Sequence, residues 1–324
     1  MWIDAVLLIL MYSMKVMMRF FPILLLGCSD YKVSGQSSIE TFFQNERLEG
    51  IDILWVIDDS ATMYEENDLL MASAGEFISF VSNSSVDFQI GVVSTDMDEN
   101  PGILRGPVLD VETSEMEDRF VEQIGSDRVG SRDERGFEAA LIAADPNVNM
   151  DFARARSDLE MVIFSDEDDH SDVEAATFLS QLQSQRPDSS VKIHAVVGDP
   201  PAGCVSVLAA ADVGARYLEA QEASGGRRES ICTLDYGSML ARVALDVIGL
   251  DTVFVMTKVP SPPTIELLVD GVEVQRRDVD GWRYNPGDNS IVFDGFAVPR
   301  AGATINITYN EWAGPLEDLE EVAE

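Results

Sequence analysis

Short apolar runs alternate with stretches of helical periodicity through the middle of the chain. The runs that suit buried strands lie at 51–57, 88–94, 161–164 and 191–197. Apolar residues recur at helical spacing over 63–82, 134–145, 173–185 and 235–249. Strands that alternate with helices in this way are typical of a parallel sheet covered by helices on both faces. The pattern predicts an α/β domain over 50–250, built on a doubly wound, mostly parallel sheet.

The pattern changes after Asp251 to short β-type runs separated by Pro, Gly and Asn-Pro turns. The dipeptide Asp270-Gly271 is typical of a hairpin turn. These features predict a small β-rich C-terminal module over 251–315, followed by a disordered acidic tail at 316–324. Before the α/β domain, residues 28–49 are polar and contain Ser and Gly, which predicts a flexible tether.

Two of the apolar runs open directly into oxygen-bearing side chains. Asp58, Ser60 and Thr62 follow the run at 51–57 at alternate positions, and Asp166 follows the run at 161–164. Ligands of open α/β sheets bind at the carboxyl ends of strands, so Asp58 and Asp166 face one point if their strands are neighbours. Oxygen ligands without Cys or His suit Mg²⁺, Mn²⁺ or Ca²⁺ rather than zinc or copper. The four side chains therefore predict a divalent-cation site.

This combination resembles the von Willebrand factor A (vWA) domains, whose metal-ion-dependent adhesion site (MIDAS) carries D-x-S-x-S on the first strand–helix loop. The chain has DDSAT at 58–62, in which Thr62 replaces the last Ser and keeps the hydroxyl, and Asp166 matches the later metal-site Asp of the family. The family also offers a Thr from the loop before the third helix. The corresponding stretch has no Thr, which leaves Ser131, Asp133 and Glu134 as candidate replacements.

Further segments resemble a bacterial lipoprotein branch of the vWA family. They are FQIGVVSTDMD at 88–98, SDEDD at 165–169, VKIHAVVGDPPAGC at 191–204, SGG at 224–226 and SIC at 230–232. The resemblance implies a vWA fold over roughly 50–250 and a cation with one position open for an Asp or Glu carboxylate of a protein partner. Thr95 and Asp96, at the end of the neighbouring strand, are expected on the same rim, where they would support the ligands.

Other interpretations of these residues stay open. A D-x-S-x-T sequence also suits a helix N-cap, and SDEDD also suits a solvated acidic loop. An apolar strand that ends in Asp begins the haloacid-dehalogenase-like phosphohydrolases, but they need a carboxylate where this chain has Ser60. A structural lipoprotein with a degenerate metal site is the other alternative, and the missing Thr favours it.

The histidines do not favour an enzyme. The chain has two, His170 and His194, and neither stands with a G-x-S-x-G motif. We expect His170 in a loop and His194 inside a strand, with neither acting as a general base. No G-x-x-x-x-G-K-S/T phosphate loop is present either.

The amino terminus predicts export. Residues 20–28, FFPILLLGC, follow Lys15 and Arg19, as in a secretory signal with a cleavage site. The ending LLGC resembles the bacterial lipobox, which implies removal of residues 1–27 and lipid attachment to Cys28. By the rule of that family, Ser29 favours delivery to the outer membrane. An uncleaved anchor helix is the alternative.

Cysteine use and charge agree with an exported protein. Cys204 and Cys232 form the remaining pair, and an oxidising compartment favours a disulfide over two free buried thiols. The 22 Lys and Arg against 58 Asp and Glu give a net charge of −36, which repels nucleic acid and anionic membrane surfaces. The sequence thus predicts a non-enzymatic, lipid-anchored protein of the cell envelope that serves adhesion or envelope assembly. It is expected to bind a protein partner through Mg²⁺, with Mn²⁺ or Ca²⁺ as alternatives.

Overall fold

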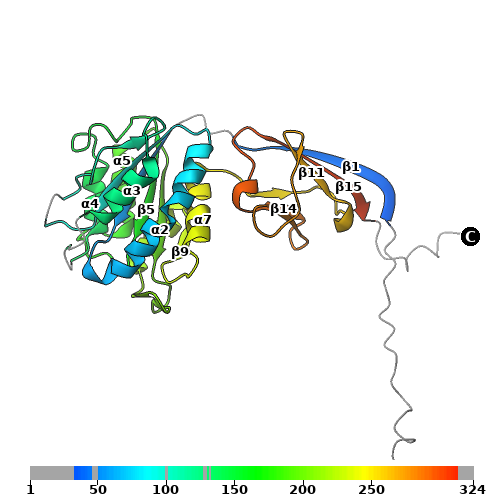
Figure 1. Ribbon diagram of the computed structural model, residues 1–324. Coiled ribbons are helices and arrows are strands. Elements are labelled where there is room, and N and C mark those ends of the chain that lie inside the picture. The colour runs from blue at the N-terminus through cyan, green and yellow to red at the C-terminus, as the bar shows by residue number, and fades with distance from the viewer. Residues whose placement is uncertain (1–32, 46–49, 99–100, 127–129, 131–132, 313–324) are drawn as a thin grey trace, which may run out of the picture.

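A six-stranded sheet forms the centre of the first of two bodies in the computed structural model (Figure 1). The structure describes residues 33–45, 50–98, 101–126, 130 and 133–312. The predicted signal peptide, the lipidation residue Cys28, the candidate ligand Ser131 and the acidic tail lie outside these residues. Within the described ranges, no helix has the length and apolar character needed to cross a membrane.

The sheet has the strand order β4-β3-β2-β5-β6-β9. Its strands are β2 (Ile51–Ile57), β3 (Phe88–Ser94), β4 (Leu109–Asp110), β5 (Asp158–Phe164), β6 (Val191–Val197) and β9 (Arg228–Ser230). All neighbours are parallel except β3 and β4. β2 lies at the centre, and all seven of its residues are buried. This arrangement confirms the predicted α/β fold with a mostly parallel sheet.

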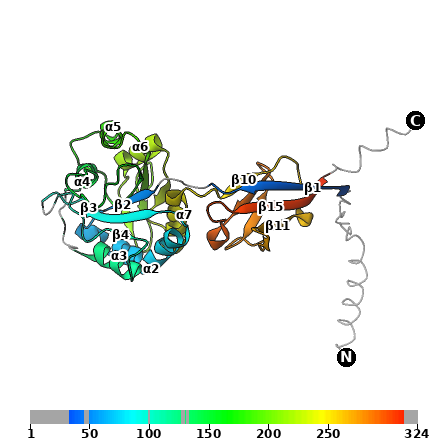
Figure 2. The same cartoon turned by 90° about the horizontal axis from the view of Figure 1, so that it is seen from above.

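Helices cover both faces of the sheet, as Figure 2 shows. One face carries α2 (Tyr64–Asn83), α3 (Met116–Gly125) and α7 (Tyr236–Ile248), and the other carries α4 (Gly136–Ala143), α5 (Ala175–Gln185) and α6 (Ala215–Ser224). Successive residues of β2 point to opposite faces, so Trp55 packs on Phe77 and Phe120 while Leu54 and Val56 join the other core. The sequence pattern predicted four of these helices but neither α3 nor α6.

The second body is a β-rich module of two antiparallel sheets. One sheet has the order β1-β15-β11-β12 and the other β10-β14-β13. The strands are β1 (Val33–Phe43), β10 (Val253–Val255), β11 (Glu266–Val269), β12 (Val272–Glu273), β13 (Trp282–Asn285), β14 (Ser290–Phe293) and β15 (Thr304–Trp312). The two bodies pack against each other through Phe80 and Phe296, whose rings stack with centroids 4.4 Å apart.

One predicted segment is wrong over half of its length. Residues 33–43 were expected in a flexible tether, but they form β1, which pairs antiparallel with β15. β1 is an edge strand, and among its side chains whose burial is described Phe42 packs against the core. The ring of Phe42 lies 5.7 Å from that of Phe254. The polar composition of β1 therefore did not indicate a strand. Its partner, β15, comes from the other end of the chain.

Candidate metal centre

The carboxyl ends of β2, β3 and β5 stop at one level and present their loops together. Ile57 pairs with Ser94 on one side and with Phe164 on the other. The ladder extends one step further, because the N–H of Asp58 donates to Phe164 O at 3.0 Å and the N–H of Thr95 donates to Ile57 O at 3.1 Å. The backbone of the sheet thus fixes where each loop begins.

The structure brings the four predicted ligands into one cluster. The hydroxyls of Ser60 and Thr62 lie 2.8 Å apart, and Thr62 Oγ1 donates to Asp166 Oδ1 at 3.3 Å. The N–H of Ser60 donates to Asp58 Oδ1 at 2.9 Å. Asp58, Ser60 and Asp166 are buried, whereas Thr62 is exposed and opens the cluster to solvent.

Two residues that the sequence patterns did not single out hold Asp58 in place. Ser165 Oγ donates to Asp58 Oδ2 at 2.7 Å, and Asn67 Nδ2 donates to the carbonyl of Asp58 at 3.1 Å. Ser165 immediately precedes Asp166, and Asn67 lies on α2, which begins just after the loop. One anchor lies on α2 and the other follows β5, so the orientation of Asp58 depends on the packing of α2 and β5.

Of the two candidate replacements for the missing Thr that the structure describes, Glu134 reaches the cluster. Its side chain is buried, and the hydroxyl of Thr95 donates to Glu134 Oε2. The other carboxyl oxygen, Oε1, has no hydrogen-bond donor among the described residues. The loop is held by the N–H of His170, which donates to Glu134 O at 2.7 Å.

The other two candidates behave differently. Asp133 is exposed and pairs with Arg135, whose Nη2 lies 2.7 Å from Asp133 Oδ2. Ser131 lies outside the described residues. Of the expected rim residues, Thr95 reaches the cluster through Glu134, whereas one carboxyl oxygen of Asp96 accepts from the N–H of Asp98 at 2.7 Å.

The environment of the cluster disfavours the ionised forms of its carboxyls. Burial, and after it the charge of Asp58, raises the pKa of Glu134 to about 9 and the pKa of Asp166 to about 7. Burial also raises the pKa of Asp58 itself. The guanidinium of Arg105 serves another acid, because it forms an ion pair with Asp59. Asp59 also accepts from Ser94 Oγ at 2.8 Å.

The donor set suits a hard cation. In the described parts of the chain, no group of three or more His, Cys, Asp or Glu side chains is arranged to hold a metal ion. The candidate set is instead mixed, with two carboxylates from Asp58 and Asp166 and two hydroxyls from Ser60 and Thr62. Oxygen-only sets are those that Mg²⁺, Mn²⁺ and Ca²⁺ accept. The ionised forms of the Glu134 and Asp166 carboxyls are disfavoured by burial and by the charge of Asp58, so positive charge at the cluster would stabilise them.

A cleft of about 430 Å³ adjoins the cluster. Thr62, Asp166 and Glu167 line one side, and a hairpin lines the other. The hairpin is formed by β7 (Cys204–Val205) and β8 (Ala210–Ala211), between β6 and α6. Its backbone connects to the cluster, because the N–H of Asp212 donates to Asp166 O at 2.8 Å.

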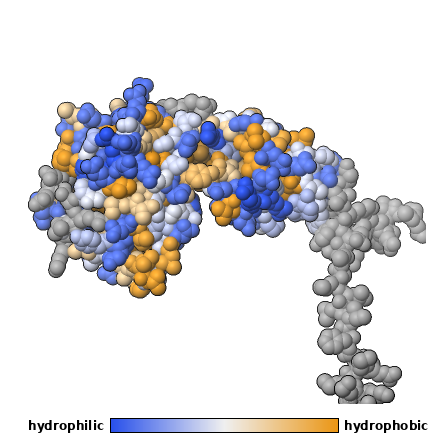
Figure 3. Space-filling view, in the orientation of Figure 1, coloured by the Kyte–Doolittle hydropathy of each residue, from blue (hydrophilic) through white to orange (hydrophobic). Residues whose placement is uncertain are grey.

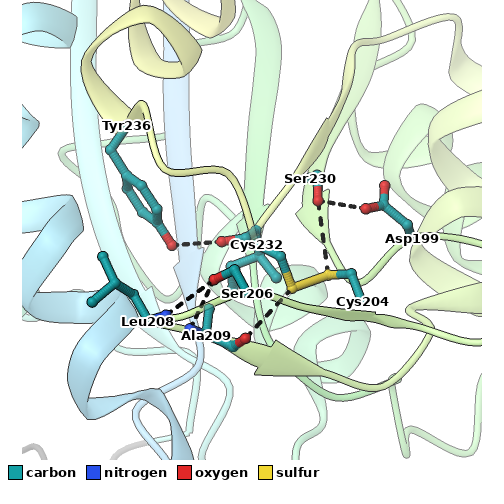
Figure 4. The surroundings of a disulfide bond; sticks show 9 residues. Asp199, Cys204, Ser206, Leu208, Ala209, Ser230, Cys232 and Tyr236 are labelled. Atoms are coloured by element: carbon teal, nitrogen blue, oxygen red, sulfur yellow. Dashed lines mark hydrogen bonds between the residues drawn. A yellow bond between two sulfur atoms is a disulfide. The ribbon is translucent and has the colours of Figure 1, made fainter. Parts of the chain in front are cut away.

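The predicted disulfide between Cys204 and Cys232 is confirmed, with Cα atoms 6.1 Å apart. Figure 4 shows that it ties the hairpin to the loop between β9 and α7. Tyr236, at the start of α7, supports this loop by donating from its hydroxyl to Ile231 O at 2.8 Å. The bridge therefore fixes one wall of the cleft.

Both histidines lie apart from the ligand cluster. His194 is buried on β6, where Nε2 lies 2.9 Å from Glu160 Oε2 and Nδ1 accepts from the N–H of Arg227 at 3.0 Å. The side chain of His170 is exposed, with Nδ1 3.5 Å from Asp133 Oδ1. The placement agrees with the expected loop position of His170 and strand position of His194.

The raised pKa of Glu134 predicts that the stability of the cation-free protein depends on pH. Its folded pKa of about 9 exceeds the ordinary value of 4.5, so folding keeps a proton that the unfolded chain releases. In chelator, the free energy of unfolding of the wild type is expected to fall as pH rises from about 5 to 9. Glu134→Gln should show a flatter profile. Urea unfolding across this pH range measures the free energy for both proteins. Parallel profiles would refute the raised pKa of Glu134.

Family models and curated protein sequences give no match to this chain. Among solved structures, it is similar to the pilus adhesin SpaC from Lactobacillus rhamnosus GG in the open conformation, with a TM-score of 0.50 and 10% identity. The alignment covers 86% of this chain and 43% of SpaC, so the chain spans less than half of that adhesin. At this identity the likeness extends to the fold alone.

Two further solved structures are similar at lower scores. A von Willebrand factor type A protein from Catenulispora acidiphila has a TM-score of 0.41 and 10% identity, with 89% of this chain and 67% of that chain covered. Proximal thread matrix protein 1 from the mussel byssus, with a zinc-occupied MIDAS motif, has a TM-score of 0.42 and 12% identity, with 68% and 52% covered.

Proposed function

We propose that this protein binds a divalent cation at the Asp58–Asp166 cluster and uses the cation to hold a carboxylate of a protein partner. The observation that carries the proposal is the series of contacts from Asp58 through Ser60 and Thr62 to Asp166, which opens onto a cleft. These four side chains would hold the cation directly or through water, and Glu134, which contacts Thr95 and Asp58, would stabilise it from beside Asp58. When bound, the cation supplies an electrophilic centre for an incoming Asp or Glu.

Mg²⁺ is the cation we propose, with Mn²⁺ and Ca²⁺ as alternatives. Two hydroxyls in the donor set add no charge, so the ion would keep more of its own charge than in a site made only of carboxylates. That residual charge favours an anionic partner group. A carboxylate is the common anionic side chain of proteins, which makes a protein partner the natural occupant.

Binding rather than catalysis is favoured by the residues around the cluster. A phosphohydrolase of the type considered above needs a carboxylate where Ser60 stands, and Ser60 contacts Thr62. His194 is engaged by Glu160 and the backbone of Arg227 on β6. We therefore propose a non-enzymatic role in adhesion or envelope assembly.

The cellular setting is part of the same proposal. The lipobox-like LLGC at 25–28 supports attachment of a lipid to Cys28 and delivery to the outer membrane. The disulfide supports an oxidising compartment. A net charge of −36 supports protein partners over nucleic acid.

Calorimetric titration with MgCl₂, MnCl₂ and CaCl₂ tests the cation site. Wild type is expected to bind one ion with saturable heat, and Asp166→Asn to bind at least about tenfold more weakly, a loss of roughly 1.4 kcal/mol. Asp188→Asn is the matched control, because it removes the same charge from an exposed turn before β6. Equal heats in all three proteins would mean charge screening and would favour a structural lipoprotein with a degenerate site.

A further inference from the structure

The tip of the disulfide-anchored hairpin is the most exposed apolar feature beside the candidate cation site. Val205 is 84% exposed, Val207 86% and Leu208 46%. Figure 3 shows an orange patch at the lower end of the α/β domain, where this hairpin runs in Figure 1. In a chain with a net charge of −36, a cluster of three exposed aliphatic side chains at one tip is a candidate contact surface.

The hairpin is held rigidly although its tip is exposed. Ser206 closes the tip, because its Oγ accepts from the N–H of Ala209 at 3.0 Å and its own N–H donates to Ala209 O at 2.7 Å. The disulfide fixes one end of the hairpin, and the hydrogen bond from Asp212 to Asp166 fixes the other end. A pre-ordered surface binds with less loss of conformational entropy than a mobile one.

The tip and the cation site border one cleft. Thr62 and Asp166 line it from the ligand cluster, and Cys204, Val205, Ala210 and Ala211 line it from the hairpin. A segment that enters through this cleft to place a carboxylate at the cluster therefore passes the hairpin. A neighbouring side chain of that segment would cover Val205 and Val207.

The charges around the cleft restrict the segment further. Glu167 and Asp212 also line it, so additional acidic residues in a partner would be repelled. Basic residues beside the single carboxylate would be attracted. A second copy of this chain is disfavoured as the occupant, because both copies would carry a charge of −36.

We infer that the hairpin is the apolar half of a docking surface whose polar half is the cation site. Its occupant is a segment of another protein with one Asp or Glu, an adjacent aliphatic or aromatic side chain and flanking Lys or Arg. The carboxylate enters the cleft toward the cluster and the apolar side chain covers the hairpin tip. This inference rests on the proposed function, since it takes the cation as the anchor of the carboxylate.

Selection of displayed linear 12-residue peptides on the intact protein in MgCl₂ tests the inference. Enriched peptides are expected to combine one acidic residue with an adjacent apolar residue and basic flanks, and EDTA should release them. Val205→Ser with Val207→Ser should weaken the selected peptides about tenfold or more, because the buried apolar surface is lost. The matched control is Val255→Ser with Val272→Ser, which changes two exposed valines of the β-rich module and should leave binding unchanged.

Calorimetry with Mg²⁺ separates failure of this inference from failure of the proposed function. The hairpin variant should bind Mg²⁺ as the wild type does. Peptides that need the cation but tolerate the hairpin variant would overturn the docking surface and leave the cation site standing. Peptides without an acidic residue, peptides insensitive to EDTA, an absence of enriched peptides, or self-association that the hairpin variant abolishes would also overturn it. A wild type that binds none of Mg²⁺, Mn²⁺ and Ca²⁺ would refute the proposed function itself.

Discussion

A hundredfold excess of Mg²⁺ over its dissociation constant is expected to raise the free energy of unfolding of the wild-type protein by about 2.7 kcal/mol. The reason is that only the folded chain brings the ligands together. Thr62 and Asp166 are in hydrogen-bond contact although they stand 104 positions apart in sequence. Urea unfolding of the protein in MgCl₂ and in EDTA measures the difference.

Asp58→Ala should abolish this stabilisation, because it removes a carboxylate that no neighbour can replace at the same place. Asp188→Asn, in an exposed turn, should keep it. An equal gain in Asp58→Ala would show that Mg²⁺ acts by screening the net charge of −36, and the assignment of the site would then fail. Unfolding of each variant in EDTA establishes that it folds.

The expected gain follows from how charge is distributed at the sheet edge. Asp59 has its own buried partner in Arg105, so its charge is compensated within the protein. Burial raises the pKa of Asp59 as well as those of Asp58 and Asp166, but of these three acids only Asp59 has a cationic partner among the described residues. A cation at the cluster removes the cost of holding these carboxylates ionised. The contrast with Asp59 suggests that only one of the two adjacent acids is left for an external cation.

Local sequence was sufficient to predict the centre of the fold. The strand at 51–57 is apolar throughout, as a strand buried on both faces must be, and its helix begins within a few residues. Because parallel strands carry ligands at their carboxyl ends, Asp58 and Asp166 could be placed together before their contacts were known. β2 and β5 are indeed neighbours.

Contacts between distant segments could not be predicted in the same way. The ion pair of Arg105 with Asp59 joins two loops, and nothing in either loop's sequence specifies the other. The choice of Glu134 over Asp133 depends on backbone bonds from His170 to Glu134 and from Arg135 to Thr95. Gly130 belongs to the same loop, where a side chain would collide with the carboxylate of Asp59.

The β-rich module shows the same limit on a larger scale. β1 pairs with β15, so the first and last described strands of the chain meet. The Ser-rich start of β1 has too few apolar positions to give a strand pattern. β1 is ordered by its hydrogen bonds to β15 rather than by apolar side chains of its own. Its local sequence therefore predicts a tether.

Removal of the disulfide in the double variant Cys204→Ala with Cys232→Ala is expected to lower the free energy of unfolding by roughly 3 to 4 kcal/mol, because the bridge restricts the unfolded chain. The closed loop spans 28 positions. Urea unfolding of wild type and variant, each with and without reductant, measures the effect. Reductant should destabilise the wild type and leave the variant unchanged.

The same double variant separates the two halves of the proposed surface. Mg²⁺ affinity should stay close to that of the wild type, since Asp58 follows β2 directly and Asp166 stands two residues after β5, so that the sheet places both. Peptides selected on the wild type should bind more weakly, because the loosened hairpin must be ordered on binding. A variant that unfolds with the wild-type free energy would contradict the stabilising role of the bridge. A variant that no longer binds Mg²⁺ while remaining folded would show that the hairpin shapes the cation site. The hairpin wall of the cleft and the ligands of the cation would then act as one unit.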